Sequence, residues 1–214
     1  MVVTLSETNS VANHYIAELR DVSVQKDRMR FRNNLERLGG ILAYEISKSL
    51  DYNEQMITTP LGSAKTQLMS VQPVIVTILR AGLPLYNGFL SHFDKADSGF
   101  VGAYRIEGGQ EVSIASEYMA VGDLNDRPLL IVDPMLATGK SMVSTLKKLL
   151  KFGEPSSIHL AAAIAAPEGI NYINENFGKI CTIWAGAVDE MLDENAYIVP
   201  GLGDAGDLSF GDKS

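Results

Sequence analysis

Residues 133–141, DPMLATGKS, stand between an apolar run and a stretch with helical spacing. The last three letters match the end of a nucleoside-triphosphate P-loop, a pattern that also requires a glycine where this chain has Pro134. Proline has no amide hydrogen to donate to a phosphate and cannot adopt the backbone angles of that glycine. The P-loop interpretation is therefore excluded, and this segment needs another explanation.

The same segment has the composition of an anion-binding loop. Asp133 ends the apolar run, Thr138 and Ser141 contribute hydroxyls, and Gly139 permits a close approach of the backbone. A helix that begins here presents free N–H groups and the positive end of its dipole, which suit a phosphate. An ordinary strand-to-helix turn capped by Thr or Ser has the same local pattern. Both interpretations stay open on this segment alone.

Two arginines stand at the ends of two other apolar runs. Arg80 follows residues 74–79 directly and precedes Ala81 and Gly82, while Arg105 ends the next such run. Taken singly, each could be a solvated side chain beside a turn. Together with the loop described above, they favour a polyanionic ligand, because guanidinium groups bind phosphate oxygens well.

The segment 197–211, YIVPGLGDAGDLSFG, has an unusual composition for the end of a chain. Its last thirteen residues include four glycines and two aspartates. Such tails are commonly disordered, but Tyr197, Ile198, Leu202 and Phe210 provide an apolar skeleton. An ordered glycine-rich loop presents bare N–H and C=O groups, which can recognise a small planar heterocycle.

Five apolar runs alternate with helix-like segments from residue 73 onward. Runs that are apolar on both faces and alternate with helices are typical of a parallel sheet covered on both sides. We therefore predict an α/β fold with a Rossmann-like, mainly parallel sheet flanked by helices, in which ligands bind at the carboxyl ends of the strands. The predicted strands are residues 74–79, 99–105, 128–133, 157–166 and 179–187.

The first part of the chain is predicted to be helical. Apolar residues recur at three- and four-residue spacing through residues 11–50, and the Gly-Gly pair at 39–40 is expected to weaken or break the second helical stretch. Residues 51–62 then indicate a turn and a short edge segment that Pro60 ends. Pro167 is placed to open a helix after the fourth predicted strand.

Composition narrows the functional classes. The 214 residues suffice for one ample domain, and 46% of them are hydrophobic and 21% charged. The net charge of −8 argues against a general nucleic-acid binder, although backbone amides and a metal ion can still attract an anion. We expect neither a membrane span nor a signal peptide. The single cysteine, Cys181, is expected to be a buried, inert thiol, which fits a reducing cytoplasm.

Four segments together resemble one known family. They are ILRAGLP (78–84), AYR (103–105), LIVDPMLATGKS (130–141) and YIVPGLGDAGDLSFG (197–211), in the order of that family's motifs. On these motifs the chain resembles the uracil phosphoribosyltransferases, and LRD, FR and LAYE among the first 50 residues resemble the family's N-terminal helices. The resemblance implies transfer of the 5-phosphoribosyl group from 5-phosphoribosyl 1-diphosphate to uracil, with UMP and diphosphate as products.

The resemblance also implies how a single domain, residues 1–214, is divided. Residues 1–60 would form a helical N-terminal part and residues 73–190 the α/β core. Residues 105–127 would form a flexible two-stranded arm that acts as a lid over the donor, and residues 197–211 would form the tail loop that binds uracil. The N- and C-terminal parts together would form a hood over the site.

A role for each matching residue follows from the same resemblance. Asp133 would bond the ribose hydroxyls, and Asp204 would lie close to the ribose and diphosphate of the donor. Arg80 would take the diphosphate with the backbone of Ala81 and Gly82, and Arg105 would close over it, so that Arg105, Asp133 and Asp204 are the predicted catalytic residues. The other predicted substrate-binding residues belong to the phosphate loop (Pro134, Met135, Leu136, Ala137, Thr138, Gly139, Lys140 and Ser141) and to the main-chain reader of uracil (Ile198, Gly203 and Ala205).

Further expectations concern cofactors and partners. Mg²⁺ would be bound through the donor, and no metal ligand is predicted in the protein. His14, His92 and His159 show no triad or metal spacing and are expected to be structural or solvated. Family members form homodimers or larger homo-oligomers, and GTP activates some of them, but the sequence decides neither point for this chain. No nucleic-acid or membrane partner is expected.

Two departures from the family pattern and two rival interpretations remain. Lys140 occupies the place of the second glycine in a loop that often reads ATGGS, and it either adds a charge at the phosphate or points to solvent. The arm lacks the acid that often follows YR, which leaves the contacts of the lid open.

A non-catalytic relative that binds RNA is disfavoured by the acidity of the chain and its intact tail. A transferase for another base would need a different reader in place of GLGDAG.

Overall fold

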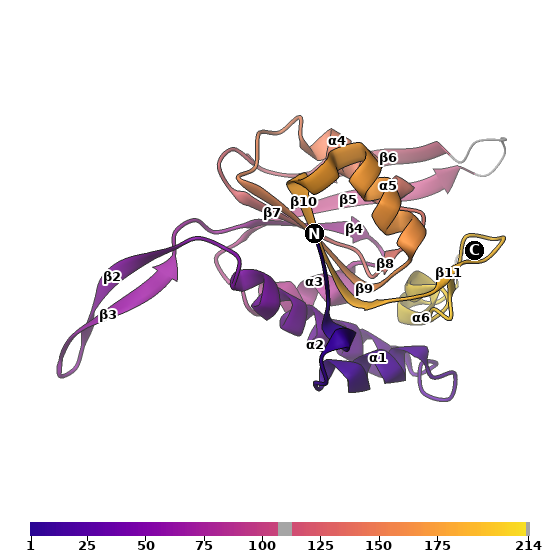
Figure 1. Ribbon diagram of the computed structural model, residues 1–214, viewed down its shortest axis with the longest axis horizontal. Coiled ribbons are helices and arrows are strands. Elements are labelled where there is room, and N and C mark those ends of the chain that lie inside the picture. The colour runs from indigo at the N-terminus through magenta and orange to yellow at the C-terminus, as the bar shows by residue number, and fades with distance from the viewer. Residues whose placement is uncertain (107–112, 213–214) are drawn as a thin grey trace.

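A computed structural model describes residues 1–106 and 113–212, and a mainly parallel sheet runs through its centre (Figure 1). The eight strands follow the order β1-β10-β9-β7-β4-β5-β6, with β8 paired to β9. All pairs in this sheet are parallel except β5–β6. The strands are β1 (Val2–Thr4), β4 (Val74–Leu79), β5 (Asp97–Ile106), β6 (Ser113–Ala120), β7 (Pro128–Val132), β8 (Met135–Leu136), β9 (Ser157–Ala165) and β10 (Cys181–Val188). The predicted α/β fold is confirmed, and β4, β5, β7, β9 and β10 are the five predicted strands.

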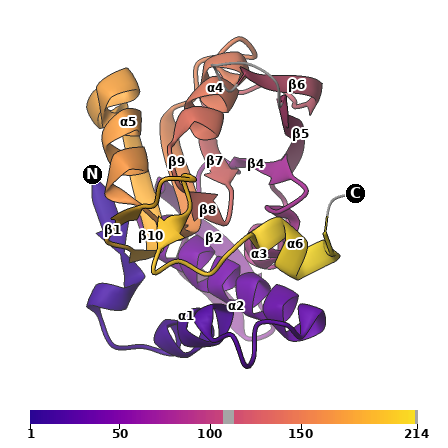
Figure 2. The same ribbon diagram turned by 90° about the vertical axis from the view of Figure 1, so that its right-hand side faces the viewer.

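Helices cover both faces of this sheet (Figures 1 and 2). One face carries α1 (Ala12–Arg20), α2 (Arg28–Ser47) and α3 (Leu83–Leu90), and the other carries α4 (Lys140–Leu149) and α5 (Pro167–Phe177). Pro167 is the first residue of α5, as predicted, because the fixed φ of proline suits the first helical position. The short α6 (Ala205–Phe210) follows near the end of the chain. The 3₁₀ turns are η1 (Leu5–Glu7) and η2 (Gly178–Ile180).

The central strands are buried on both sides. Ile75 packs into the core that contains the residues of α1, α2 and α3, whereas Val74 and Val76 pack with the residues of α4 and α5. Leu130 and Leu129 of β7 divide in the same way between the two cores. Since successive side chains of a strand point to opposite faces, a strand between two helical layers must be apolar throughout. This explains the uninterrupted apolar runs of the sequence.

The expectation that the Gly-Gly pair breaks the second helix is wrong, because α2 continues without interruption from Arg28 to Ser47. A Cβ on Gly39 would lie 2.2 Å from Leu85 O, and a Cβ on Gly88 would lie 2.0 Å from Glu36 O. The glycines therefore let α2 and α3 cross with their main chains in contact. This packing offsets the weak helix propensity of glycine.

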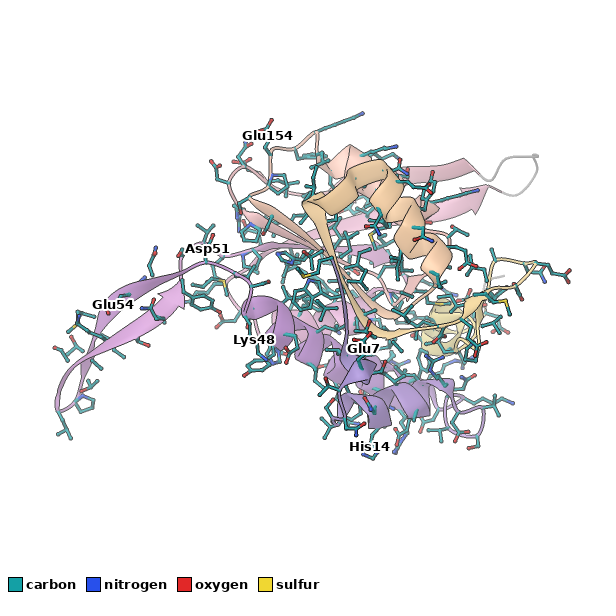
Figure 3. All side chains as sticks on the ribbon, viewed as in Figure 1. Glu7, His14, Lys48, Asp51, Glu54 and Glu154 are labelled. Carbon is teal, nitrogen blue, oxygen red and sulfur yellow. The ribbon has the colours of Figure 1, made fainter. Side chains whose placement is uncertain are left out.

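A hairpin that projects from the body follows α2 (Figures 1 and 3). It consists of β2 (Tyr52–Thr59) and β3 (Gly62–Met69), which pair with each other and form a separate two-stranded sheet. Pro60 lies in the turn, next to Leu61, whose side chain is fully exposed. Only the first half of this hairpin was predicted, because the hairpin packs against no core and neither of its strands has a strong apolar pattern. The edge strand β1 was not predicted either.

The pair β5–β6 belongs to the predicted arm. Arg105 stands opposite Ile114 in its antiparallel register. Residues 107–112 of the predicted arm, 105–127, lie outside the described residues, as do the side chains of residues 103–117. The pairing of β5 with β6 overlaps the predicted arm only at residues 105–106 and 113–120, so the two-stranded arm and its function as a lid stay predictions.

Two buried titratable groups are structural. Trp184 Nε1 donates to His159 Nδ1 at 3.1 Å, and His159 Nε2 lies 3.1 Å from Ser157 Oγ. Burial lowers the pKa of His159 to about 4 and raises the pKa of the Cys181 thiol to about 11. These positions agree with the predicted structural histidine and inert thiol. Within the ranges described above, no helix is long and apolar enough to cross a membrane.

Replacing Gly88 by alanine should destabilise the protein by about 1–3 kcal/mol, because the added Cβ would meet main-chain atoms of α2. In an uncrowded helix the same change would instead stabilise the protein by up to about 1 kcal/mol. The sign of the change in stability therefore tests the close crossing of α2 and α3. Gly62→Ala is the matched control, since a Cβ there would meet nothing within 4 Å. Urea denaturation of both variants measures the effect, and an unchanged or increased stability of Gly88→Ala would contradict the close crossing.

Candidate active site

The loops after β4 and β7 meet at the carboxyl edge of the sheet, which Figure 2 shows between α4 and α6. The two strands are parallel neighbours, and the Thr77 hydroxyl donates to Val132 O at 3.0 Å. A Cβ on Gly82 would lie 2.2 Å from Thr77 Oγ1 and 2.9 Å from Val132 O, so only glycine fits there. The edge therefore brings segments 80–82 and 133–141 together.

The loop after β7 is held by strand β9. Asp133 N donates to Ala161 O at 3.1 Å, while Pro134 O accepts from Ala163 N at 3.0 Å and from Ile164 N at 3.1 Å. Met135 and Leu136 then form β8, which continues the pairing with β9. The first half of the DPMLATGKS segment is thus an extension of the sheet, and its backbone is set by β9.

Asp133 is placed where it can interact with a ligand. Its side chain is partly accessible at the edge but closely surrounded by protein atoms, and this burial raises its pKa to about 7. A backbone hydrogen bond from Met135 opposes the shift. The charged form of such a carboxyl group is stabilised when it accepts hydrogen bonds. Asp133 is therefore suited to bind hydroxyl groups of a ligand.

The second half of the segment forms the start of α4. Gly139 precedes the helix with φ of +74°, a conformation that side-chain-bearing residues rarely adopt, and a Cβ there would lie 2.8 Å from Gly169 O. Lys140 is the first helical residue and is exposed, and its N–H lies 3.4 Å from Thr138 Oγ1. The first turn of α4 has further N–H groups without intrahelical acceptors, which suit a phosphate.

Arg80 joins the sheet edge to the end of the chain. Its Nη2 donates to Asp207 Oδ1 at 2.8 Å and to Gly211 O at 2.6 Å. Its Nε is buried without a hydrogen-bond partner among the described residues. The Arg80 side chain as a whole is 37% exposed, so an anionic ligand could reach guanidinium donors that these two hydrogen bonds leave free. Asp207 was not among the predicted site residues, although it lies within the tail motif on which the prediction rests.

Ala81 and Gly82 differ in what they contribute. The first turn of α6 lies beside Ala81, since a Cβ on Gly206 would be 3.7 Å from Ala81 Cβ. The Gly82 N–H already donates to Ile78 O at 3.0 Å. In the structure, Gly82 therefore allows close packing between the ends of two strands. A contact of its backbone with diphosphate stays a prediction.

The tail forms an ordered loop. Ile198 is buried in the short strand β12 (Ile198–Val199), which pairs with β11 (Met191–Leu192). The loop then passes the exposed Gly203 to Asp204, whose Oδ1 accepts from Asp207 N at 2.9 Å and caps α6. Ala205 is the first, buried residue of α6. The three predicted main-chain readers, Ile198, Gly203 and Ala205, thus lie on one continuous loop beside Arg80.

The N-terminal helices hold this loop through side-chain-to-main-chain hydrogen bonds. Arg20 Nη1 donates to Gly201 O at 3.0 Å, Gln25 Nε2 donates to Leu202 O at 3.1 Å, and Arg32 Nη1 donates to Ser209 O at 2.7 Å. Sequence reasoning did not single out these three side chains as site residues. Arg20 and Arg32 do lie in the segments LRD and FR, on which the N-terminal resemblance rests.

For Arg105 the structure gives only the backbone position, at the end of β5, because its side chain lies outside the description. Its predicted closure over the diphosphate stays a prediction.

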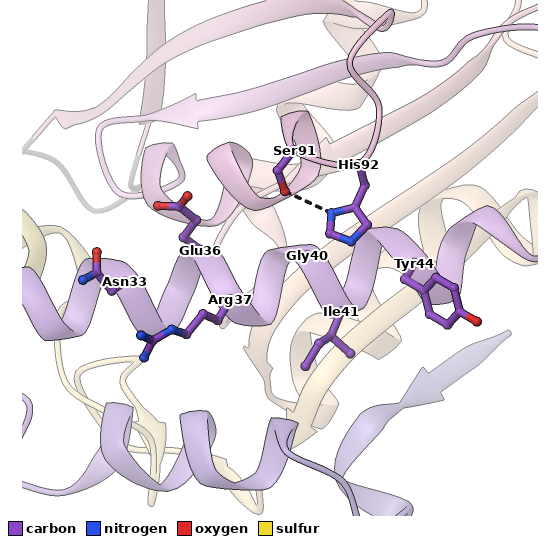
Figure 4. A pocket seen from close by; sticks show the side chains of 8 residues that line it. All are labelled: Asn33, Glu36, Arg37, Gly40, Ile41, Tyr44, Ser91 and His92. Atoms are coloured by element: carbon purple, nitrogen blue, oxygen red, sulfur yellow. Dashed lines mark hydrogen bonds between the residues drawn. The ribbon is translucent and has the colours of Figure 1, made fainter.

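A pocket of about 500 Å³ lies elsewhere, on α2 and the end of α3 (Figure 4). Its lining includes Arg37, Tyr44 and His92, and His92 Nδ1 lies 3.0 Å from Ser91 Oγ. None of the predicted site residues lines this pocket. We therefore place the candidate active site at the carboxyl edge of the sheet.

In the described parts of the chain, no three His, Cys, Asp or Glu side chains are grouped so that they could hold a metal ion. The carboxylates near the edge are Asp133 on the β7 loop and Asp204 and Asp207 on the tail.

A mainly parallel sheet between two helical layers, with a carboxylate, an arginine and a glycine-preceded helix start at its carboxyl edge, defines an α/β domain of the phosphoribosyltransferase class. The family model described as uracil phosphoribosyltransferase matches residues 6–212. The chain belongs to the uracil phosphoribosyltransferase family.

Individual relatives agree with this assignment. A uracil phosphoribosyltransferase of Porphyromonas gingivalis is 46% identical over 213 residues, which cover 99% of both chains. One of Thermococcus gammatolerans is 37% identical over 199 residues, 92% of this chain and 87% of that one. The solved structure of the AQ2163 protein from Aquifex aeolicus superposes with a TM-score of 0.88 at 33% identity, over 99% of this chain and 98% of that chain.

If Asp133 bonds the ribose hydroxyls as predicted, donor binding should strengthen as the pH rises through about 7, because only the charged carboxylate would accept hydrogen bonds with both oxygens. Between about pH 6 and about pH 8 we expect an affinity gain of roughly tenfold. Asp133→Asn should bind the donor more weakly and should lack this gain.

Isothermal titration with 5-phosphoribosyl 1-diphosphate at both pH values measures the effect. The Asn variant reports the pH dependence of the ligand's own phosphates, so equal slopes for the two proteins would exclude Asp133 as the titrating group. Because the folded-state pKa is raised, the same group lowers stability as the pH rises from about 4 to about 7, and Asp133→Asn should lose this slope too.

Proposed function

We propose that the chain transfers the 5-phosphoribosyl group from 5-phosphoribosyl 1-diphosphate to uracil and releases UMP and diphosphate. Family membership across residues 6–212 carries this proposal. The placement of a carboxylate, an arginine and a helix start at one sheet edge, next to a glycine-rich tail, supports it. In the reaction, the bond from ribose C1 to the diphosphate oxygen breaks and a bond from C1 to a uracil nitrogen forms, while the N–H bond of that nitrogen breaks and its proton is released.

The residues at the edge would position the donor. Charged Asp133 would accept hydrogen bonds from the ribose hydroxyls, and the segment from Ala137 to Ser141 would hold the 5-phosphate at the first turn of α4. Arg80 would bind the diphosphate through donors that its bonds to Asp207 and Gly211 leave free. Since glycosyl transfer passes through an oxocarbenium-like state, catalysis here depends on orientation and charge stabilisation more than on covalent participation of the protein.

Base recognition would come from the tail. The main-chain groups of Ile198, Gly203 and Ala205 would bond the edge of uracil, and Asp204 would lie close to the ribose and diphosphate. Main-chain readers discriminate by the fixed course of the backbone, and caps such as the hydrogen bond that Asp207 N–H donates to Asp204 Oδ1 stabilise that course. Arg105 would close over the diphosphate from β5.

Mg²⁺ is proposed as the cofactor. Bound to the diphosphate oxygens, it would neutralise the charge that develops on the leaving group. Oxygen ligands are the kind that Mg²⁺ prefers, and Asp133 and Asp204 supply carboxylates near the donor's expected position. The ion would be held through the donor, and no protein side chain is proposed as a required metal ligand.

A homo-oligomeric assembly and a cytoplasmic location are also proposed. A homodimer or larger homo-oligomer is supported by the projecting hairpin of β2 and β3, whose exposed side chains include Met56, Ile57 and Leu61, because an isolated hairpin is marginally stable in water. A buried free thiol as the single cysteine supports a cytoplasmic location. Activation by GTP stays a prediction. Neither nucleic acid nor membrane is proposed as a partner.

The purified protein should form UMP from uracil and the donor with a requirement for Mg²⁺, and it should release little diphosphate with cytosine, hypoxanthine or no base. Diphosphate release with each base measures this. A robust reaction with a purine and none with uracil would contradict the proposal and favour a transferase for another base. Binding of RNA without any turnover would favour the non-catalytic alternative.

Lys140→Gly should weaken donor binding by about tenfold or less and should make it less sensitive to salt. Lys140 is exposed at the start of α4, where a positive charge opposes the helix dipole by about 0.3–1 kcal/mol. A bound phosphate would reverse that sign. Titrations of the donor at two salt concentrations, for both proteins, measure the change. Identical affinities and salt slopes would place the Lys140 charge in solvent, away from the phosphate.

A further inference from the structure

A partly buried ion pair between Arg20 and Asp189 binds the main chain of the tail loop at Gly201. Arg20 Nη2 lies 2.5 Å from Asp189 Oδ1, and Arg20 Nη1 lies 2.7 Å from Asp189 Oδ2. The Gly201 N–H donates to Asp189 Oδ2 at 2.9 Å, while Gly201 O accepts from Arg20 Nη1 at 3.0 Å. The pair therefore takes both main-chain polar groups of Gly201.

The two partners are fixed to different parts of the fold. Asp189 follows β10, its N–H donates to Ala165 O of β9 at 2.8 Å, and its side chain is 4% exposed. Arg20 is the last residue of α1, and its side chain is 22% exposed. The carboxylate is thus anchored to the sheet and the guanidinium to the N-terminal helices. Gly201 lies between these two anchors.

Gly201 is a point at which the course of the loop is set. It has φ of +62°, and a Cβ there would lie 2.0 Å from Ile198 O. It stands between Ile198 on one side and Gly203 and Ala205 on the other. A displacement of Gly201 would therefore change the spacing of the three proposed main-chain readers.

The side chain of Gln25 also fixes the tail loop to the N-terminal segment. Gln25 Nε2 donates to Leu202 O at 3.1 Å and to Leu19 O, on α1, at 2.9 Å. The amide thereby ties the residue after Gly201 to the same helix that carries Arg20. The N-terminal segment holds two consecutive residues of the loop.

We infer that Arg20 and Asp189, assisted by Gln25, are positioning residues that determine how tightly the tail loop binds its pyrimidine base. This inference rests on the proposed function of the loop as the reader of uracil. The ion pair acts through the Gly201 backbone, so its loss changes base binding while the donor contacts at Asp133 and the start of α4 are unaffected.

The test compares Asp189→Asn and Gln25→Ala with a matched control. The control is Arg30→Gln, because Arg30 makes a similar two-bond pair with Glu18 that joins α2 to α1 and not to the tail. Steady-state kinetics with uracil and with the donor, together with thermal unfolding, are measured for each protein.

Asp189→Asn should raise the KM for uracil roughly tenfold to a hundredfold, as expected for the loss of a charged hydrogen bond, while the KM for the donor stays within about twofold. Gln25→Ala should raise the KM for uracil about two- to tenfold. Arg30→Gln should lower the unfolding temperature without changing either KM. The KM of Arg20→Lys for uracil should lie between the values of the wild type and of Asp189→Asn.

Equal rises of both KM values, or a fall of kcat alone that follows the loss of folded protein, would show a purely structural role and overturn the inference. If Asp189→Asn does not fold, Gln25→Ala decides, and an unchanged KM for uracil then overturns it. Failure of the proposed function is separate, since it would show as a wild-type protein that does not use uracil.

Discussion

The parallel pairing of β4, β7 and β9 is the constraint on which the remainder of the structure depends. It places the ends of β4 and β7 side by side, with the Thr77 hydroxyl bonded to Val132 O. Pairing of the β7 loop with β9 then directs the chain from Asp133 to the start of α4. A carboxylate, an arginine and free helical N–H groups thereby share one edge, although they come from separate loops.

An acidic chain can bind a polyanionic donor only if positive potential is concentrated locally. The chain has a net charge of −8, yet the edge offers Arg80, the first turn of α4 and the exposed Lys140. Arg80 is already paired with Asp207 of the tail. The same guanidinium therefore connects the carboxyl edge of the sheet to α6 and the residue that follows it, beyond the residues proposed to read the base.

Sequence patterns predicted the elements whose periodicity comes from burial. The double-sided apolar strands required two helical layers, and the order of the motifs indicated the family. The uninterrupted α2 was missed, because helix propensity penalises 39–40 while the compensating contact with Gly88 is long-range. The hairpin half β3 was missed because the hairpin packs against no core, so neither of its strands carries a strong apolar pattern. At the site, Asp207 escaped notice because nothing local marks it as the partner of Arg80.

By itself, the sequence determined the α/β class, the strands that end in Arg80 and Asp133, and the family, because these depend on local burial patterns and on motif letters. Only the tertiary structure decided which groups meet. The raised pKa of Asp133 comes from its burial in the folded chain, and the Arg20–Asp189 pair joins residues from opposite ends of the chain around Gly201. Such contacts depend on the packing of distant segments, and no local spacing encodes them.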